Sequence, residues 1–313
     1  MVPWAKIREA DGIPQSNFVN NRNWEGFSPD PYLTGWAMRE SILGLQDAGI
    51  IATAKHFILN EQEHFRQPGS VPGYPGLPAI TSNIDDRTLH EIYLPPFAEA
   101  VRAGVGAVMC SYQQVNNSYA CQNSKILNGL LKDELGFEGF VMTDWGAQHS
   151  GVLSALSGVD MTMAGQTTCC SPTPADSFWG PNLTTAVLNG SVPLSRVDDM
   201  VTRIMATWYY TGQDQGYPEV SFSTWTQKTY DYTYYAGKAG YGEVNYHLNV
   251  RSNHDSLMRG IVADSIILLK NVNNTLPLIK PTQIGVFGSD AGPGVGGPNQ
   301  FSDRGMALSI KLI

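Results

Sequence analysis

Short apolar runs alternate with amphipathic stretches along the first two thirds of the chain. Four runs are continuous, rich in β-branched residues and cut off by polar residues, at 50–54, 105–109, 139–143 and 159–163. Continuous apolar runs of this length are typical of strands buried on both faces of a parallel sheet. We therefore predict four parallel strands at these positions.

Helical spacing of apolar residues separates the predicted strands. It covers 89–101 and 126–135, and a glycine that suits a left-handed cap follows each stretch. A further helix is predicted over 195–210, where Ser195 and Asp198 have the spacing of a capping box. The repetition of strand, helix and strand predicts βαβ units, which build either a (β/α) barrel or a doubly wound sheet.

Polar, chemically capable side chains follow the predicted strands. Lys55 and His56 come after the first, Tyr112 after the second and Asp144 after the third. Barrels of the TIM type build their active sites at the C-terminal ends of their strands. We therefore favour an α/β fold with a partial (β/α)8 TIM-type barrel over the doubly wound sheet.

The last third of the chain changes character. Residues 212–253 are rich in Tyr, Gly, Thr and Ser with little periodicity, which indicates a connecting segment. A helix through 257–269 and a strand over 283–287 then lead into a glycine-rich stretch. We predict a barrel domain over 1–211, a linker over 212–253 and the beginning of an α/β sandwich domain over 254–313.

Composition and charge narrow the range of partners. The 313 residues include 20 basic and 28 acidic side chains, giving a net charge of −8, and the basic residues are scattered, so nucleic acid is not an expected partner. No apolar run approaches the ~20 residues of a membrane span, and the first residues lack the pattern of a signal peptide. Four glycosylation sequons nevertheless suit a secreted parent protein: Asn116, Asn182, Asn189 and Asn273.

The four cysteines suggest a structural role. Cys110 and Cys121 can close a short loop in an oxidising compartment, whereas the adjacent Cys169 and Cys170 can bridge only with strain. Neither pair has a further Cys or His at zinc-ligand spacing, and no metalloprotease motif surrounds His64. No metal or other cofactor is expected.

The sharpest motif spans residues 130–147. A helix, a glycine turn and a buried strand here deliver Asp144, followed by Trp145. A carboxylate at the tip of a stiff strand is held in one orientation, which suits a nucleophile, although a helix cap or an ion pair fits its position equally well. Over its whole length this stretch closely resembles the nucleophile signature of glycoside hydrolase family 3, which implies that Asp144 is the catalytic nucleophile.

Three other segments resemble the same family in the same order along the chain. They lie at 22–31, 54–61 and 109–112, and fainter similarity continues to residue 301. The resemblance implies a substrate-binding set whose donors bind sugar hydroxyls and whose aromatic rings lie beside the sugar and the nucleophile: Arg22, Lys55, His56, Met109, Tyr112 and Trp145. Taken singly, these residues also fit ordinary structural roles, such as a solvated Lys-His pair or a packed core tyrosine.

Within the family the resemblance is closest to fungal β-glucosidases. It implies hydrolysis of terminal β-D-glucosyl residues from β-glucosides such as cellobiose and cello-oligosaccharides, with retention of the anomeric configuration. Three departures accompany it. Residues 1–20 match none of the family's first barrel strands, the loop at 166–175 is atypical, and the family's acid/base glutamate lies beyond the matching part. The chain is therefore expected to be a fragment whose turnover is low, since loss of acid/base help costs about 10²- to 10⁴-fold.

Three alternatives stay open. The same family includes β-xylosidases and exo-glucanases, and a non-catalytic sugar-binding fragment belongs to another functional class. A nucleotide-binding loop at 288–298 is the weakest, because Pro293 and Pro298 interrupt it and no Lys-Ser or Lys-Thr follows.

Overall fold

The computed structural model describes residues 25–63, 65–69, 73–163, 165, 177–223, 226–234 and 238–285. The chain divides after Gln215 into two compact units, and each is considered by itself. Several features singled out above lie outside the described residues: Arg22, the loop at 166–175 with Cys169 and Cys170, and the glycine-rich stretch at 288–298.

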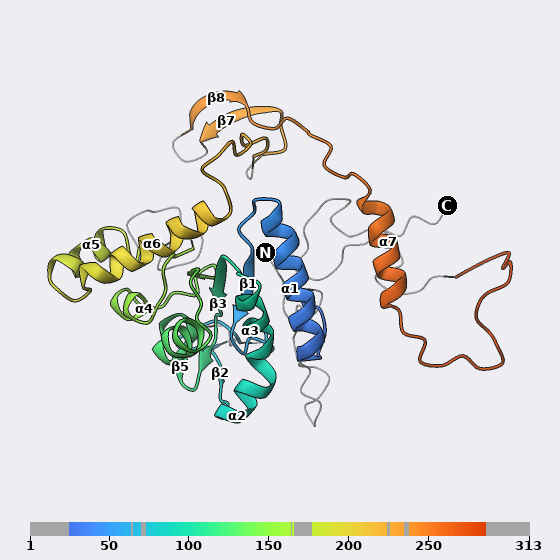
Figure 1. The fold of residues 1–313 in the computed structure, drawn as a ribbon, viewed down its shortest axis with the longest axis horizontal. Helices are drawn as coiled ribbons and strands as arrows, with labels where there is room; N and C mark the ends of the chain where they lie inside the picture. Colours follow the sequence, from blue (N-terminus) through green and yellow to red (C-terminus); the bar gives the residue numbers. More distant parts are fainter. Residues whose placement is uncertain are drawn as a thin grey trace. The chain divides into compact units, whose positions relative to one another are not determined.

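A parallel sheet forms the centre of the first unit. Its strands are β1 (Thr53–Phe57), β3 (Ala107–Cys110) and β6 (Phe140–Thr143), side by side in the order of the chain (Figure 1). Three of the four predicted strands are thus confirmed, with starts one to three residues later than predicted. The fourth, at 159–163, is reduced to a single parallel bridge between Met142 and Met161.

The largest shift affects β1, which begins at Thr53 rather than residue 50 and includes the two polar residues expected to follow it. All five of its residues are buried, Lys55 and His56 among them. Both polar side chains have ionic partners inside the protein, and these contacts offset the free-energy cost of removing them from water. Apolar runs alone therefore place the end of this strand too early.

Helices connect the strands as predicted. Between β1 and β3 lie α2 (Asp86–Thr88), η3 (Leu89–Tyr93) and α3 (Pro95–Arg102), and between β3 and β6 lies η5 (Lys125–Glu134). The η5 helix is a π-helix, wider than an α-helix, and at its end the Leu135 N–H donates to the carbonyl five residues earlier at 2.9 Å. Each parallel strand pair therefore belongs to a strand–helix–strand unit.

One long helix was not predicted: α1 (Pro31–Asp47), which packs against α3. Its start has a clear local cause, because the Asp30 carboxylate accepts hydrogen bonds from the N–H groups of Tyr32 and Leu33 and Pro31 occupies the first turn. Its buried face carries a threonine and a glycine beside two large apolar residues, so the apolar stripe is weak: Thr34, Gly35, Met38 and Ile42.

The remaining elements of this unit surround the sheet: β2 (Thr81–Ser82), β4 (Gln114–Val115) and β5 (Ser118–Tyr119) in a small second sheet, η4 (Ala120–Gln122), α4 (Val152–Leu156), α5 (Pro181–Leu188) and α6 (Leu194–Tyr210). The predicted capping box at α6 is wrong. The helix begins one residue earlier, Pro193 takes the cap position with an extended backbone, and no side chain caps it. Ser195 is therefore already inside the helix.

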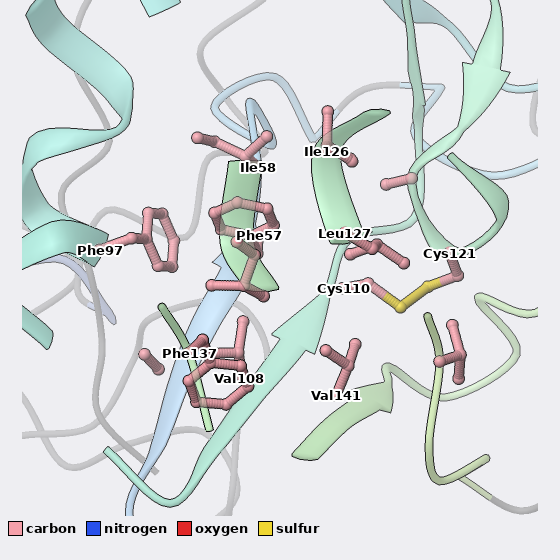
Figure 2. Packing of buried hydrophobic residues seen from close by; sticks show 14 of the residues in the cluster. Phe57, Ile58, Phe97, Val108, Cys110, Cys121, Ile126, Leu127, Phe137 and Val141 are labelled. Atoms are coloured by element: carbon pink, nitrogen blue, oxygen red, sulfur yellow. A yellow bond between two sulfur atoms is a disulfide. The ribbon is translucent and has the colours of Figure 1, made fainter. Parts of the chain in front are cut away.

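The core of the first unit lies between the sheet and its helices. Phe57 of β1 meets Phe97 of α3 edge to face, with ring centroids 4.9 Å apart (Figure 2). The Cys110–Cys121 disulfide lies in the same cluster and joins the end of β3 to η4, a pairing that the sequence allowed but did not decide. The bridge fixes the loop between those residues, and Tyr112 belongs to that loop.

A buried ionic network holds the strand that carries Asp144. The Asp160 carboxylate accepts hydrogen bonds from the Val141 N–H of β6 at 2.7 Å, from Lys132 of η5 at 2.9 Å and from Arg196 of α6 at 2.7 Å. Burial lowers the pKa of Lys132 to about 8, although the neighbouring Asp160 acts in the opposite direction. Two helices and one strand are thus tied to a single carboxylate.

The second unit contains a hairpin of β7 (Tyr230–Tyr234) and β8 (Ala239–Glu243) and the helix α7 (His254–Ser265). The hairpin lies inside the segment predicted to connect two domains, where Tyr230, Tyr232 and Tyr234 alternate with polar residues in the period of a strand. The predicted strand at 283–287 is absent from 283–285, and its other two residues lie outside the described part. The domain bounds stay a prediction. None of the described helices combines the length and apolarity needed to cross a membrane.

Candidate active site

The carboxyl ends of the three parallel strands bring Asp144, His56 and Tyr112 together. Asp144 directly follows β6 and is 6% exposed. His56 Nε2 lies 3.0 Å from Asp144 Oδ2, and the Trp145 N–H donates to Oδ1 at 2.6 Å. The Tyr112 hydroxyl adds a third hydrogen bond to this carboxylate. Asp144 is therefore buried, fixed in orientation and surrounded by donors.

This environment keeps Asp144 ionised. Burial alone would raise the pKa of its carboxyl group. The hydrogen bond and charge of His56, followed by the Trp145 N–H and the Tyr112 hydroxyl, outweigh burial and lower the pKa below its usual value. A carboxylate that stays charged while largely removed from water is a ready nucleophile.

A bulge in β1 directs His56. In the ladder with β3, Lys55 pairs with Met109 and Phe57 pairs with Cys110, so His56 has no opposite residue. Bulges of this kind re-aim side chains next to active sites. Here the bulged residue is the one that contacts Asp144.

Lys55 makes an ion pair with Glu25, with Nζ 2.7 Å from Oε2. The two side chains are only 9% and 14% exposed, so the pair holds the segment after Arg22 against the end of β1. The motif around Arg22 suggested that this segment belongs to the site, but nothing in the sequence indicated that Glu25 would be the partner of Lys55. The charge of this carboxylate is the only signal that was available.

The two remaining candidates differ in exposure. Met109 is 1% exposed in the middle of the sheet, between Lys55 and Met142, whereas Trp145 is 50% exposed. An exposed indole beside Asp144 is available to stack on an apolar face of a ligand. Within the described ranges, His, Cys, Asp and Glu side chains form no group of three or more that could hold a metal ion.

Sequence reasoning missed a group on the loop after β1. Glu63 accepts a hydrogen bond from Asn60 Nδ2 at 2.9 Å and pairs with Arg66. The Arg66 guanidinium carbon lies 4.6 Å from the centroid of the Tyr112 ring. The spacing of Glu63 and Arg66 was visible in the sequence, but its meaning depends on which ring the loop covers.

The family model for the N-terminal domain of glycosyl hydrolase family 3 matches residues 15–207, which is more than half of the chain. The chain belongs to glycosyl hydrolase family 3. The resemblance noted at the four motifs is thereby confirmed.

Relatives within family 3 share much of the sequence. Beta-glucosidase 1 of Aspergillus aculeatus is 58% identical over 289 residues, which cover 91% of this chain and 33% of that protein. Beta-glucosidase A of Aspergillus kawachii is 55% identical, with the same coverage. The family 3 chain thus spans about a third of the length of the curated relatives it matches.

Solved structures agree. The family 3 β-glucosidase of Neurospora crassa matches with a TM-score of 0.82 and 55% identity, over 90% of this chain and 34% of that one. The fold prediction is confirmed: the first unit of this family 3 chain is part of a TIM-type barrel. β-Glucosidase 3B of Thermotoga neapolitana, solved in complex with glucose, matches with a TM-score of 0.58 and 28% identity over 69% of this chain and 28% of that one.

Replacing His56 is expected to raise the pKa of Asp144. The fall in the labelling rate of Asp144 at acidic pH, here called the acid limb, should then begin at a higher pH. In His56→Ala the burial that raises the pKa of Asp144 is opposed by fewer donors, so a larger fraction of the carboxyl is protonated in mildly acidic solution. His56→Gln keeps an amide donor without the charge and should shift the limb less. The measurement is the rate at which an activated fluoroglucoside labels Asp144, as a function of pH.

The control for this prediction is His90→Gln. His90 also contacts a carboxylate, with Nε2 3.1 Å from Glu134 Oε1, but it lies on η3 with a partly exposed side chain. Its loss should leave the pH profile unchanged. An unchanged profile in His56→Ala would mean that His56 does not set the charge of Asp144.

Proposed function

We propose that the chain carries the nucleophile of a retaining β-glucosidase, with Asp144 in that role and a terminal β-D-glucosyl residue as substrate. The observation that supports this most strongly is the environment of Asp144: a buried carboxylate, held by His56, Trp145 and Tyr112 and kept ionised by them. The choice of glucose as the sugar rests on relatives that are named as β-glucosidases.

The proposed chemistry has two steps. An Asp144 oxygen attacks C1 of the glucosyl residue, a C–O ester bond forms, and the bond from C1 to the leaving oxygen breaks with its electron pair on that oxygen. Water then attacks C1 of the ester and gives one proton to the conjugate base of the acid used in the first step, while the bond from C1 to the Asp144 oxygen breaks and restores the carboxylate. The oxygen not used in attack keeps a hydrogen bond, which stabilises the charge as it moves. In the first step the leaving oxygen takes a proton from an acid, which we do not assign to any described residue.

We assign substrate-binding roles to six residues: Arg22, Lys55, His56, Met109, Tyr112 and Trp145. Exposed Trp145 would stack on the apolar face of the sugar, while Lys55 and His56 would bind hydroxyls. Both of these already have carboxylate partners, so a bound hydroxyl would share their protons rather than replace the ion pairs.

The test is covalent labelling with 2,4-dinitrophenyl 2-deoxy-2-fluoro-β-D-glucoside. Dinitrophenolate leaves without protonation, and the fluorine slows hydrolysis of the ester, so adduct formation depends on the nucleophile and on sugar binding. We expect one fluoroglucosyl group per chain, located on Asp144 by peptide mass spectrometry. Faster labelling by the corresponding xyloside would favour a β-xylosidase, and glucose binding without any adduct would favour a non-catalytic sugar-binding role.

We further propose that the protein is secreted, glycosylated and active on cellobiose and cello-oligosaccharides. Support comes from the Cys110–Cys121 disulfide, typical of oxidising compartments, and from the four sequon asparagines, all of which are exposed. Protein secreted by a fungal host should lose mass on endoglycosidase treatment. Because the Asn189 side chain lies in an exposed turn after α5, Asn189→Gln should reduce that loss by one glycan.

A further inference from the structure

The loop after β1 places a cation on the ring of Tyr112. The Arg66 guanidinium carbon is 4.6 Å from the ring centroid. Tyr112 itself is 5% exposed, and its hydroxyl hydrogen-bonds Asp144. A cation over the face of an aromatic ring is attracted by the ring quadrupole, more strongly where water is excluded. Arg66 is therefore linked to the proposed nucleophile through one residue, Tyr112.

Arg66 is held in this position rather than extended into solvent. Its guanidinium pairs with Glu63, whose side chain is 4% exposed and also accepts a hydrogen bond from Asn60 at 2.9 Å. The backbone is fixed as well, because the Arg66 N–H donates to the Glu63 carbonyl and the Ile80 N–H donates to the Phe65 carbonyl. A buried carboxylate and two backbone bonds thus set the plane that covers Tyr112.

We propose that Arg66 is a positioning residue for the nucleophile, acting through Tyr112, an inference that rests on the proposed glycosidase function. Stacking limits rotation of the Tyr112 ring and so aims its hydroxyl at Asp144. The positive charge also draws electron density from the phenol, which makes the hydroxyl a stronger donor. Arg66 is expected to act through Tyr112, because within the described part of the chain the groups that face the Asp144 carboxylate are His56 from β1, the Trp145 N–H and Tyr112.

The test compares two substitutions of Arg66. Arg66→Met removes the cation and keeps much of the side-chain length, whereas Arg66→Lys keeps a cation beside Glu63. We expect Arg66→Met to slow labelling of Asp144 by the fluoroglucoside about three- to tenfold, the range of a partly desolvated cation–π contact. Its acid limb should move to higher pH, and Arg66→Lys should restore most of both properties.

Arg102→Met is the matched control. Arg102 pairs with the glutamate three residues before it, as Arg66 does, but it lies on α3 with an exposed side chain. It should label like the wild type. Thermal unfolding of each variant shows whether a slower reaction reflects loss of folded protein.

A second readout separates this inference from the proposed function. The Asp144 carboxyl can be titrated by ¹³C NMR in protein labelled at aspartate, with Asp144→Asn for assignment. If wild-type protein forms no adduct, the glycosidase proposal fails, and a rise of the Asp144 pKa in Arg66→Met still supports the action of Arg66 on the carboxylate. An unchanged titration in Arg66→Met overturns it, as does an equal loss of labelling in both variants without movement of the acid limb.

Discussion

Asp144→Ala abolishes covalent labelling by the fluoroglucoside and lowers cleavage of dinitrophenyl glucoside on the order of 10⁴-fold or more. The reason is that in the proposed mechanism an Asp144 oxygen forms the bond to C1, and the described groups around it cannot take its place: His56, Trp145 and Tyr112 donate hydrogen bonds to that carboxylate. The measurements are intact-protein mass spectrometry and release of dinitrophenolate. Asp199→Asn, a change at a partly exposed aspartate of α6, serves as the control and should label normally.

Chemical rescue sharpens this prediction. In Asp144→Gly, azide has room to occupy the place of the carboxylate and attack C1 from the same side, which gives an α-glucosyl azide from a β-glucoside. Asp199→Asn should give none. Persistence of the adduct in Asp144→Ala, or its location on another residue, would remove Asp144 from the nucleophile role.

Asp160→Asn lowers the free energy of unfolding of the first unit by about 3–5 kcal/mol, because it breaks a buried ion pair on one side only. Lys132 and Arg196 are just 6% and 12% exposed, so neither can regain full hydration when the charge of Asp160 is lost. Urea unfolding followed by tryptophan fluorescence measures the difference. The pKa of Lys132, about 8 in the intact network, should fall further, since Asp160 is the charge that raises it.

Asp199→Asn is again the control. Asp199 pairs with two arginines of its own helix α6, Arg196 at 2.7 Å and Arg203 at 2.8 Å, but its side chain is 41% exposed. Solvent screens its pairs, and the expected loss is within about 1 kcal/mol. Combining Asp160→Asn with Lys132→Met should recover part of the stability by removing one unpaired cation. A loss below about 1 kcal/mol in Asp160→Asn itself would show that the network does not hold β6.

Stability and reactivity are linked through β6. Asp160 binds the Val141 N–H in the middle of this strand, three residues before Asp144. Arg203 of α6 donates to the carbonyls of Phe137 and Gly139, just before the strand begins. Asp160 and Arg203 thus hold the strand that leads to the proposed nucleophile, although neither takes part in the proposed reaction.

The strand-end pattern predicted much of this site. Continuous apolar runs are enough to indicate buried parallel strands, and the carboxyl ends of such strands meet at one edge, so Asp144, His56 and Tyr112 were expected to be neighbours. The short spacing of Cys110 and Cys121 allowed their bridge, and the structure decided it. Local failures had local causes: α1 has a weak apolar stripe, and Pro193 displaced the expected cap of α6.

Residue patterns were sufficient to predict three parallel strands, the helices between them and the family, because these properties follow from periods and motifs along the chain. The long-range partners of individual side chains became visible only in the folded chain: Glu25 for Lys55, the Tyr112 ring for Arg66, and Lys132 and Arg196 for Asp160. Such partners are separated by about 30 to 50 residues. No period or local spacing encodes a contact of that range, since it arises only when packed strands and loops bring distant side chains into a shared space of low dielectric constant.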